Sequence, residues 1–272
     1  MKNFKKQISD SFDRGSEYYE LNSNIQKNIC IELLNFYKKI SKSNKNIQIE
    51  NALDIGCGSG FMTGQINKRE NLKKIHLIDI SKKMISKAKE NLSEEKFSFE
   101  VVDFDTFRNY ESYDFIFSNM SLHWSENFSI FFLYLLNQMP SGGSLVFSIP
   151  TSIKFDFESL EMGKDLIEEL INTLPDFNIL ERKIDVEKFF FLSKKKKFKE
   201  KFKKPLDFFL NLKSIGANFN LKKTKKNIFF LRRMNSEITI NYNISFFFIK
   251  RLDHRCLKVT LFRVMILMLV KQ

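Results

Sequence analysis

The chain has 272 residues, of which 43% are hydrophobic, and this is enough for a buried core in one domain or in one domain with an appended lobe. The net charge of +13 is uneven: residues 1–190 carry 24 Lys and Arg against 28 Asp and Glu, whereas residues 191–272 carry 21 against 4. The odd number and wide spacing of Cys30, Cys57 and Cys256 argue against a disulfide framework and against a metal site.

Neither end of the chain carries a recognisable membrane or export signal. The N-terminal stretch MKNFKKQISDSF is not followed by the apolar segment that a secretory signal requires. The apolar run VTLFRVMILMLV near the C-terminus has 12 residues and contains Arg263, so it is too short to cross a bilayer. We therefore expect a cytoplasmic protein of reduced thiols with no membrane span.

The chain opens with helical patterns. Residues 4–12 and 25–40 favour helices, and the polar stretch SKSNKN at 41–46 separates them from the first apolar strand pattern. We predict an N-terminal helical arm over residues 1–46.

The next hundred residues alternate between β-rich runs and helical patterns. Such alternation predicts a parallel sheet with helices on both faces, and ligands bind such sheets at the carboxyl ends of the strands. The predicted strands are 49–55, 73–80, 96–104, 113–120 and 142–150, and the predicted helices are 61–70, 82–92 and 127–139.

After Pro150 the alternation stops. Residues from about 155 to 204 favour helices rich in lysine, and we predict that they form a helical lid over the sheet. Leu160, Leu166, Ile167, Leu170 and Ile171 would supply its apolar face.

The remaining chain predicts one more helix and one more strand. PLDFFLNLKSIGANF resembles a helix capped by Gly216, and SEITINYNISFFFIK has the composition of a closing strand. These patterns define a main domain over 47–251 and a C-terminal extension over 252–272 to which we assign no role.

Three glycines in the stretch ALDIGCGSGFMT raise the question of what the backbone approaches. Gly56, Gly58 and Gly60 alternate, so they do not match the dinucleotide pattern G-x-G-x-x-G, and no Walker lysine follows. An adenosyl ligand without phosphates is the remaining candidate. The missing Cβ atoms would let the backbone lie against that ligand, and Asp54 at the strand end could accept a hydrogen bond from its ammonium group.

Acidic residues also end the second and third predicted strands. Asp79 can accept hydrogen bonds from both ribose hydroxyls, as an acid does in folds that bind NAD. Asp103 can accept from an adenine amino group while Phe104 lies against the base. The alternative is that Phe104 is core and Asp103 is a turn residue.

The stretch LDIGCGSG resembles the first motif of class I S-adenosylmethionine-dependent methyltransferases. The resemblance implies an α/β, Rossmann-like fold with a seven-stranded, mostly parallel sheet, and S-adenosyl-L-methionine as the cofactor. It places cofactor contacts at Asp54, Gly56, Gly58, Gly60, Asp79, Ile80, Met84, Asp103, Phe104, Ser118 and Asn119.

Further stretches resemble the malonyl-acyl-carrier-protein O-methyltransferase family of biotin synthesis. SNMSLHW resembles its SN-x-x-x-x-W loop, with His123 where many members have Gln, and SFDRGSEYYELNSNIQ resembles its N-terminal segment at Phe12, Arg14 and Tyr19. LNLKSIGANF and EITINYNISFFFIKR resemble its late segments. The family implies methylation of the malonyl carboxylate on a carrier protein or coenzyme A. An ionised carboxylate needs alignment and no base, so Tyr19 and His123 are candidates for the substrate wall.

The stretch SKKKKFKEKFKK at 193–204 holds eight lysines. It could be a solvated helix face, a dock for an acidic acyl-carrier protein, or a nucleic-acid site with Phe198 and Phe202 available for stacking. The family resemblance favours the carrier protein. Methylation of another small molecule, such as a quinone precursor, stays open, as does a non-catalytic role in a cofactor-binding assembly or with RNA.

Overall fold

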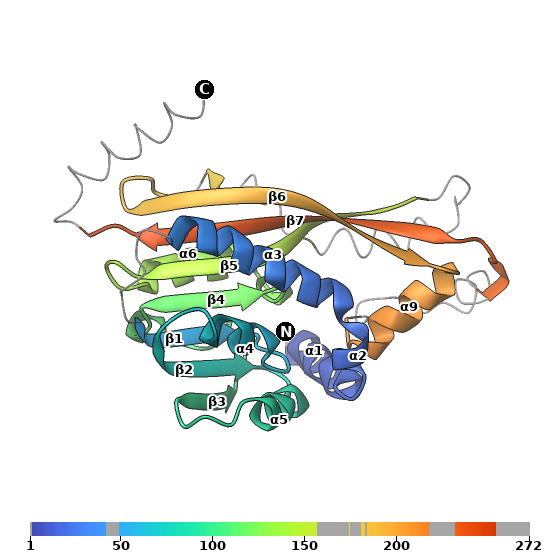
Figure 1. The fold of residues 1–272 in the computed structure, drawn as a ribbon, viewed down its shortest axis with the longest axis horizontal. Coiled ribbons are helices and arrows are strands. Elements are labelled where there is room, and N and C mark those ends of the chain that lie inside the picture. The colour runs from blue at the N-terminus through green and yellow to red at the C-terminus, as the bar shows by residue number, and fades with distance from the viewer. Residues whose placement is uncertain are drawn as a thin grey trace.

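In a computed structural model, seven strands form one sheet in the order β3-β2-β1-β4-β5-β7-β6 (Figure 1). The structure describes residues 2–41, 49–156, 184–217 and 232–253, together with 174, 181 and 182. The strands are β1 (Ile49–Ile55), β2 (Leu72–Asp79), β3 (Phe97–Val101), β4 (Phe115–Asn119), β5 (Ser144–Phe155), β6 (Phe189–Phe202) and β7 (Ile238–Arg251). The pairs among β1 to β5 are parallel, and β7 runs antiparallel to both β5 and β6. The predicted mostly parallel sheet is confirmed.

Helices cover both faces of this sheet. They are α1 (Lys2–Gly15), α2 (Tyr19–Asn22), α3 (Asn24–Ser41), α4 (Phe61–Asn67), α5 (Lys82–Asn91), α6 (Phe128–Gln138) and α9 (Pro205–Ser214), with short 3-10 turns at Tyr110–Ser112 and Leu122–Trp124. Two starts are fixed by side-chain caps: the Ser81 Oγ accepts from the backbone N–H of Met84, and the Asn127 Oδ1 accepts from that of Ile130. The helical arm expected at the N-terminus is present as α1 to α3.

The central strands have consecutive apolar residues because both of their faces are buried there. In β4, Phe115 and Phe117 belong to the core on the α3 side, and Ile116 belongs to the core on the α6 side. The Tyr37 ring of α3 stacks on Phe115 with centroids 5.2 Å apart. Full burial of one such aromatic side chain stabilises the fold by about 1.5–3 kcal/mol.

The β5-β7-β6 half of the sheet is longer than the rest. Asn119, the last residue of β4, pairs with Ser148 of β5, and that level of the sheet continues through Phe246 to Lys194 of β6. Strand β5 continues through a bulge after Pro150 to Phe155, and β6 continues to Phe202. Figure 1 shows β6 and β7 extending well past the end of β4. We call this extension the overhang: residues 149–155 of β5, 195–202 of β6 and 238–245 of β7.

The prediction of helix over 155–204 is wrong for β6. Phe190, Leu192, Phe198 and Phe202 lie two or more residues apart on one face and pack against the α3-side core, which is the period of a strand. The run of consecutive lysines at 194–197 hid this period. The rest of the predicted lid, including its apolar positions, lies outside the described residues, as do residues 254–272. The domain boundaries stay a prediction.

The late helix is present as predicted. α9 ends at Ser214, and Gly216 follows with a φ of 78°. A Cβ on Gly216 would lie 2.7 Å from the Cα of Phe12, so this turn lets α9 pack closely on α1. The late segment therefore helps to hold the N-terminal arm over the strand ends.

Candidate cofactor and substrate site

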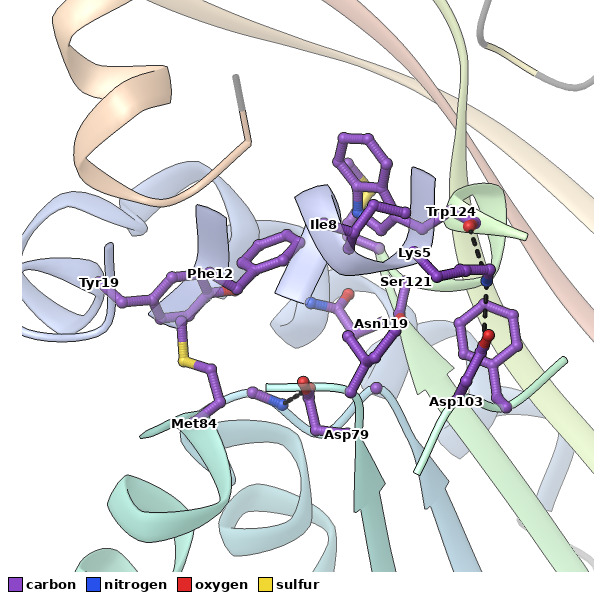
Figure 2. Close-up of a pocket in the computed structure, with 15 residues that line it drawn as sticks. Lys5, Ile8, Phe12, Tyr19, Asp79, Met84, Asp103, Asn119, Ser121 and Trp124 are labelled. Atoms are coloured by element: carbon purple, nitrogen blue, oxygen red, sulfur yellow. Dashed lines mark hydrogen bonds and ion pairs between the residues drawn. The ribbon is translucent and has the colours of Figure 1, made fainter. Parts of the chain in front are cut away.

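A cavity with an empty volume of about 550 Å³ lies at the carboxyl ends of β1, β2 and β4, beneath α1 (Figure 2). It brings together residues from the glycine turn, the three strand ends and the N-terminal arm. Its lining is Lys5, Ile8, Phe12, Tyr19, Gly56, Gly58, Asp79, Ile80, Met84, Asp103, Phe104, Asn119, Met120, Ser121 and Trp124. Eight of the eleven positions predicted to contact a cofactor therefore surround one cavity.

The glycine turn is shaped by what lies against it. Gly56 has a φ of 65°, and its N–H donates to the carbonyl oxygen of Ile78 at 2.8 Å. A Cβ on Gly56 would lie 1.7 Å from the Oγ of Ser121. Only a glycine fits between this turn and the loop after β4, so the turn places no side chain in the cavity at this position.

Asp79 ends β2 with its carboxylate held by backbone donors. Its Oδ2 accepts from the N–H of Gly58 and its Oδ1 from that of Ser81, both at 2.9 Å. Burial raises the pKa of Asp79 to about 6, and these two hydrogen bonds limit the rise. A carboxylate oriented in this way at the cavity edge can accept further hydrogen bonds from a ligand (Figure 2).

A second cavity, with an empty volume of about 390 Å³, adjoins the first and shares Tyr19, Gly56 and Asn119 with it. Asp54 lines this second cavity and is 1% exposed. Its Oδ2 accepts from the Oγ1 of Thr63 at 2.6 Å, and burial raises its pKa to about 7. Asp79 and Asp54, the acids at the ends of β2 and β1, therefore line neighbouring cavities.

Two polar atoms in the second cavity have no hydrogen-bond partner. They are the Oγ of Ser23 and the Oε1 of Gln26, and both atoms are buried. Buried polar atoms of this kind are normally paired in folded proteins, so an unpaired pair lining a cavity indicates a ligand that bonds to them. Sequence reasoning missed both residues, although each falls within the family-like segment SFDRGSEYYELNSNIQ.

Lys5 occupies the part of the first cavity next to Asp103 and Phe104. Its Nζ lies 3.0 Å from the Oδ1 of Asp103, 2.6 Å from the Oδ2 of Asp105 and 4.7 Å from the centre of the Phe104 ring. It also donates to the carbonyl oxygen of Trp124 at 3.3 Å. The sequence offered no signal for Lys5, because helix packing alone brings it to this site.

The same helix is anchored at its other end. The Oδ1 of Asp13 accepts from the Oγ of Ser81 at 2.5 Å and from the N–H of Lys83 at 3.0 Å. Ser9 donates to the carbonyl oxygen of Ile80 at 3.0 Å. Helix α1 thus spans the cavity, tied to the start of α5 at one end and to the acids after β3 at the other.

Tyr19 and Asn119 lie where the two cavities meet. Burial, with the charge of Asp79, raises the pKa of the Tyr19 phenol, so it stays protonated at neutral pH. Asn119 donates to the carbonyl oxygen of Gln26 at 3.1 Å and accepts from the Oγ of Ser148 at 2.8 Å. These bonds fix the β4 end against α3 and β5.

The other predicted residues do not line either cavity. Ser118 is buried and donates to the carbonyl oxygen of Ile55 at 2.8 Å, which supports the strand ends. Gly60 precedes α4, and Arg14 is exposed. The ring of His123 lies 4.7 Å from that of Trp124, and burial lowers its pKa to about 3, so it is neutral. The structure thus brings Tyr19 to the cavities but not His123.

Two classes of feature have no support in the described part of the chain. No group of three His, Cys, Asp or Glu side chains there could hold a metal ion. None of the helices in those segments has the length and apolar character to span a membrane.

Strand order, glycine turn and acidic strand ends together define a class I methyltransferase. A family model described as a methyltransferase domain matches residues 48–204. Among curated proteins, malonyl-[acyl-carrier protein] O-methyltransferase 2 of Coxiella burnetii is 30% identical over 91% of this chain and 97% of its own length. Malonyl-[acyl-carrier protein] O-methyltransferase 1 of Ilyobacter polytropus is 31% identical over 79% of this chain and 78% of its own.

The chain belongs to the family of malonyl-[acyl-carrier protein] O-methyltransferases, and it is an S-adenosylmethionine-dependent enzyme. Among solved structures, phosphoethanolamine N-methyltransferase 2 of Haemonchus contortus, in complex with phosphomonomethylethanolamine and S-adenosylhomocysteine, matches with a TM-score of 0.54 at 16% identity. The match covers 90% of this chain and 60% of that one, and it supports the fold.

Proposed function

We propose that this enzyme methylates the free carboxylate of a malonyl group held as a thioester on an acyl-carrier protein or coenzyme A, in biotin synthesis. The names of the relatives support the substrate, since two of them match most of this chain at about 30% identity. Because acyl carriers of this pathway work in the cytoplasm, we propose the same location for this enzyme.

We further propose that the cofactor spans both cavities. Its ribose would bond to Asp79 and its adenine would lie against Phe104 and Asp103 in the first cavity. Its amino-acid end would enter the second cavity, where the Ser23 Oγ and Gln26 Oε1 lack partners and Asp54 supplies a carboxylate. The Gly56 turn, which leaves no room for a side chain, supports this fit at the point where the cavities meet.

Methyl transfer to a carboxylate requires little acid or base catalysis. S-adenosylmethionine, when bound, supplies a methyl group already activated on a sulfonium. The malonyl carboxylate is ionised at neutral pH, so the protein needs only to align it and to exclude water. The observation that carries the proposal is the set of described residues that line both cavities: Tyr19, Gly56 and Asn119. None of the three is a base at neutral pH, because Tyr19 stays protonated.

Tyr19 is the donor that this site offers to the substrate. Its hydroxyl lies at the junction of the cavities and has no hydrogen bond to the described part of the chain. A protonated phenol in that position can donate to one oxygen of the malonyl carboxylate and leave the other oxygen to attack. A wall role for His123 stays a prediction.

The test compares two thioesters that differ in one group. With labelled S-adenosylmethionine, malonyl-carrier protein should receive one methyl group, and acetyl-carrier protein, which lacks the free carboxylate, should receive none. A quinone-precursor acid serves as the third substrate. Transfer to that acid with none to malonyl-carrier protein would contradict the proposal.

A further inference from the structure

One face of the overhang carries a row of lysines. Successive side chains of a strand point to opposite faces, so the odd-numbered lysines of β6 share one face, and Lys154 joins them across Asn241 of β7. All of these side chains are exposed. We call this surface the lysine face: Lys154, Lys195, Lys197, Lys199 and Lys201.

The lysine face is polar and almost free of acids. Between its lysines, β7 presents Thr239, Asn241 and Asn243. Among the described residues, no carboxylate forms an ion pair with any lysine of this face. Two acids lie at its ends: Asp156 follows the end of β5, and Glu181 accepts from the Oγ of Ser193, which precedes the row. The even-numbered side chains differ, because they face α3.

On the opposite face of β6, the lysines are paired with an acid of α3. Lys194 and Lys196 lie 3.9 and 2.8 Å from the Oε2 of Glu32 in α3. Glu200, the one acid of the strand, accepts from the hydroxyl of Tyr242 at 3.0 Å. The strand therefore sorts its charges, with paired groups on the α3 side and unpaired lysines on the other.

This face extends past the carboxyl ends of the parallel strands, where the proposed cofactor cavity also lies. Lys194 is level with Asn119, the end of β4, so Lys201 lies seven residues further along the strand. At about 3.3 Å a residue, the row extends roughly 23 Å beyond the strand ends. A partner bound there would lie beyond the same strand ends as the cavity.

The structure weakens the nucleic-acid alternative. Phe198 and Phe202, which could have stacked on bases, are turned to the α3 side. Phe198 packs edge-on against Phe246 at 6.2 Å, and Phe202 against Phe208 at 5.5 Å. No exposed aromatic ring lies on this face among the described residues. Its lysines are about 6.6 Å apart, which is close to the roughly 6 Å between residues four apart on a helix.

We propose that the lysine face docks an acidic helical protein, the carrier that delivers the malonyl thioester to the cavity. The inference rests on the proposed function, because it names the partner of that same site. Charge complementarity of this kind acts mainly on the rate and orientation of encounter.

The test uses two variants of equal charge. One replaces Lys195, Lys197, Lys199 and Lys201 with glutamine. The control replaces four exposed lysines at the opposite edge of the sheet, where the strands begin, and leaves the overhang intact: Lys38, Lys39, Lys68 and Lys74. For each protein, stopped-flow mixing gives the association rate with malonyl-carrier protein at several salt concentrations, and turnover of malonyl-coenzyme A gives the intrinsic activity.

We expect the lysine-face variant to associate about tenfold more slowly at low salt, with the difference vanishing at high salt. Its kcat/KM for malonyl-coenzyme A should stay within about twofold of the parent, and the control should keep both values. Equal slowing in the two variants would show an effect of net charge alone and would overturn the inference.

Two other outcomes would also overturn it. One is loss of binding to single-stranded RNA in the lysine-face variant while carrier association is unchanged. The other is a lower melting temperature with unchanged carrier association, which would mean that the lysines stabilise the fold and bind no partner. Failure of the proposed function gives a different signature, since the parent protein would then methylate no malonyl thioester at all.

Discussion

The proposed cofactor cavity and the lysine face both lie toward the carboxyl ends of the parallel strands, and they are built in opposite ways. In the cavity, acids are buried and held by backbone donors: Asp79 accepts from Gly58 and Ser81 at 2.9 Å. On the lysine face, the charges are exposed and have no ionic partner within the described residues. Binding in the cavity depends on the position of single atoms, whereas binding at the lysine face depends on the sum of several charges.

This difference predicts where a single substitution should have a large effect on binding or stability. A buried carboxylate or a close backbone contact depends on one geometry, so its loss should cause a large fall in affinity or stability. A screened surface charge contributes little by itself, and its effect falls with salt. Four changes in the cavity, from the largest expected effect to the smallest, can break or sharpen this contrast.

Gly56→Ala should have the largest effect. The new Cβ would lie 1.7 Å from the Oγ of Ser121, and the φ of 65° disfavours any side chain. We expect loss of measurable binding of S-adenosylhomocysteine by calorimetry, with a destabilisation of about 1–3 kcal/mol in chemical unfolding. Adding Ser121→Gly removes the clash and should restore part of both. Normal binding by the single variant would show that the turn can move.

Asp79→Ala should weaken cofactor binding by about 1–3 kcal/mol, because it removes an oriented acceptor beside the cavity. Titration calorimetry with S-adenosylhomocysteine measures the loss. Asp114→Ala is the matched control, since that carboxylate accepts from the N–H of Asn51 where β1 pairs with the start of β4, away from the cavity. Unchanged affinity in Asp79→Ala would mean that the ribose lies elsewhere.

Asp54→Asn should change the pH dependence of both binding and stability. Burial raises the pKa of Asp54 from 3.8 to about 7, so folding favours the protonated acid. The free energy of unfolding should therefore fall as pH rises from about 4 to 7, while affinity for the cationic cofactor rises as the carboxylate ionises.

The asparagine variant should lose the part of both trends that Asp54 contributes, while the raised pKa of Asp79 should still lower stability between about pH 4 and 6. At pH 8 it should unfold at a higher temperature than the parent and bind S-adenosylmethionine more weakly. Thermal melts and calorimetry between about pH 5 and 8 measure the two trends. A parent protein whose cofactor affinity does not change with pH would contradict a role for the Asp54 charge.

Lys5→Met should have the smallest effect, and in the opposite direction. Lys5 pairs with Asp103 and Asp105 and covers Phe104. We propose Asp103 and Phe104 as the adenine contacts, so the cofactor has to displace Lys5. Removing the ammonium should raise affinity for S-adenosylhomocysteine by about two- to tenfold, since less of the binding energy is used to open the site. Lys6→Met, exposed on the same helix, should leave affinity unchanged. Weaker binding in Lys5→Met would show that Lys5 contacts the bound cofactor.

The sequence predicted the parts of the site that lie next to a strand. Asp54, Asp79 and Asp103 each follow a recognisable β-run, so their meeting at one edge follows from the parallel sheet. Lys5 and Gln26 could not be placed in this way, because they reach the site through helices whose packing depends on distant residues such as Gly216.

The overhang was the largest error in the predicted fold. Lysine favours helices more than strands, and four in succession conceal the alternation that Phe198 and Phe202 continue. Only pairing with β7 over fourteen positions reveals the strand, and that pairing joins segments about fifty residues apart. Local propensity gave way here to tertiary contacts.

The most direct test of the central claim is a structure of the protein in complex with S-adenosylhomocysteine. We expect the ribose on Asp79, the adenine against Phe104 with Lys5 moved away from Asp103, and the amino-acid end beside Ser23 and Gln26. A complex in which Lys5 keeps its bond to Asp103 and the ligand lies outside both cavities would contradict the account.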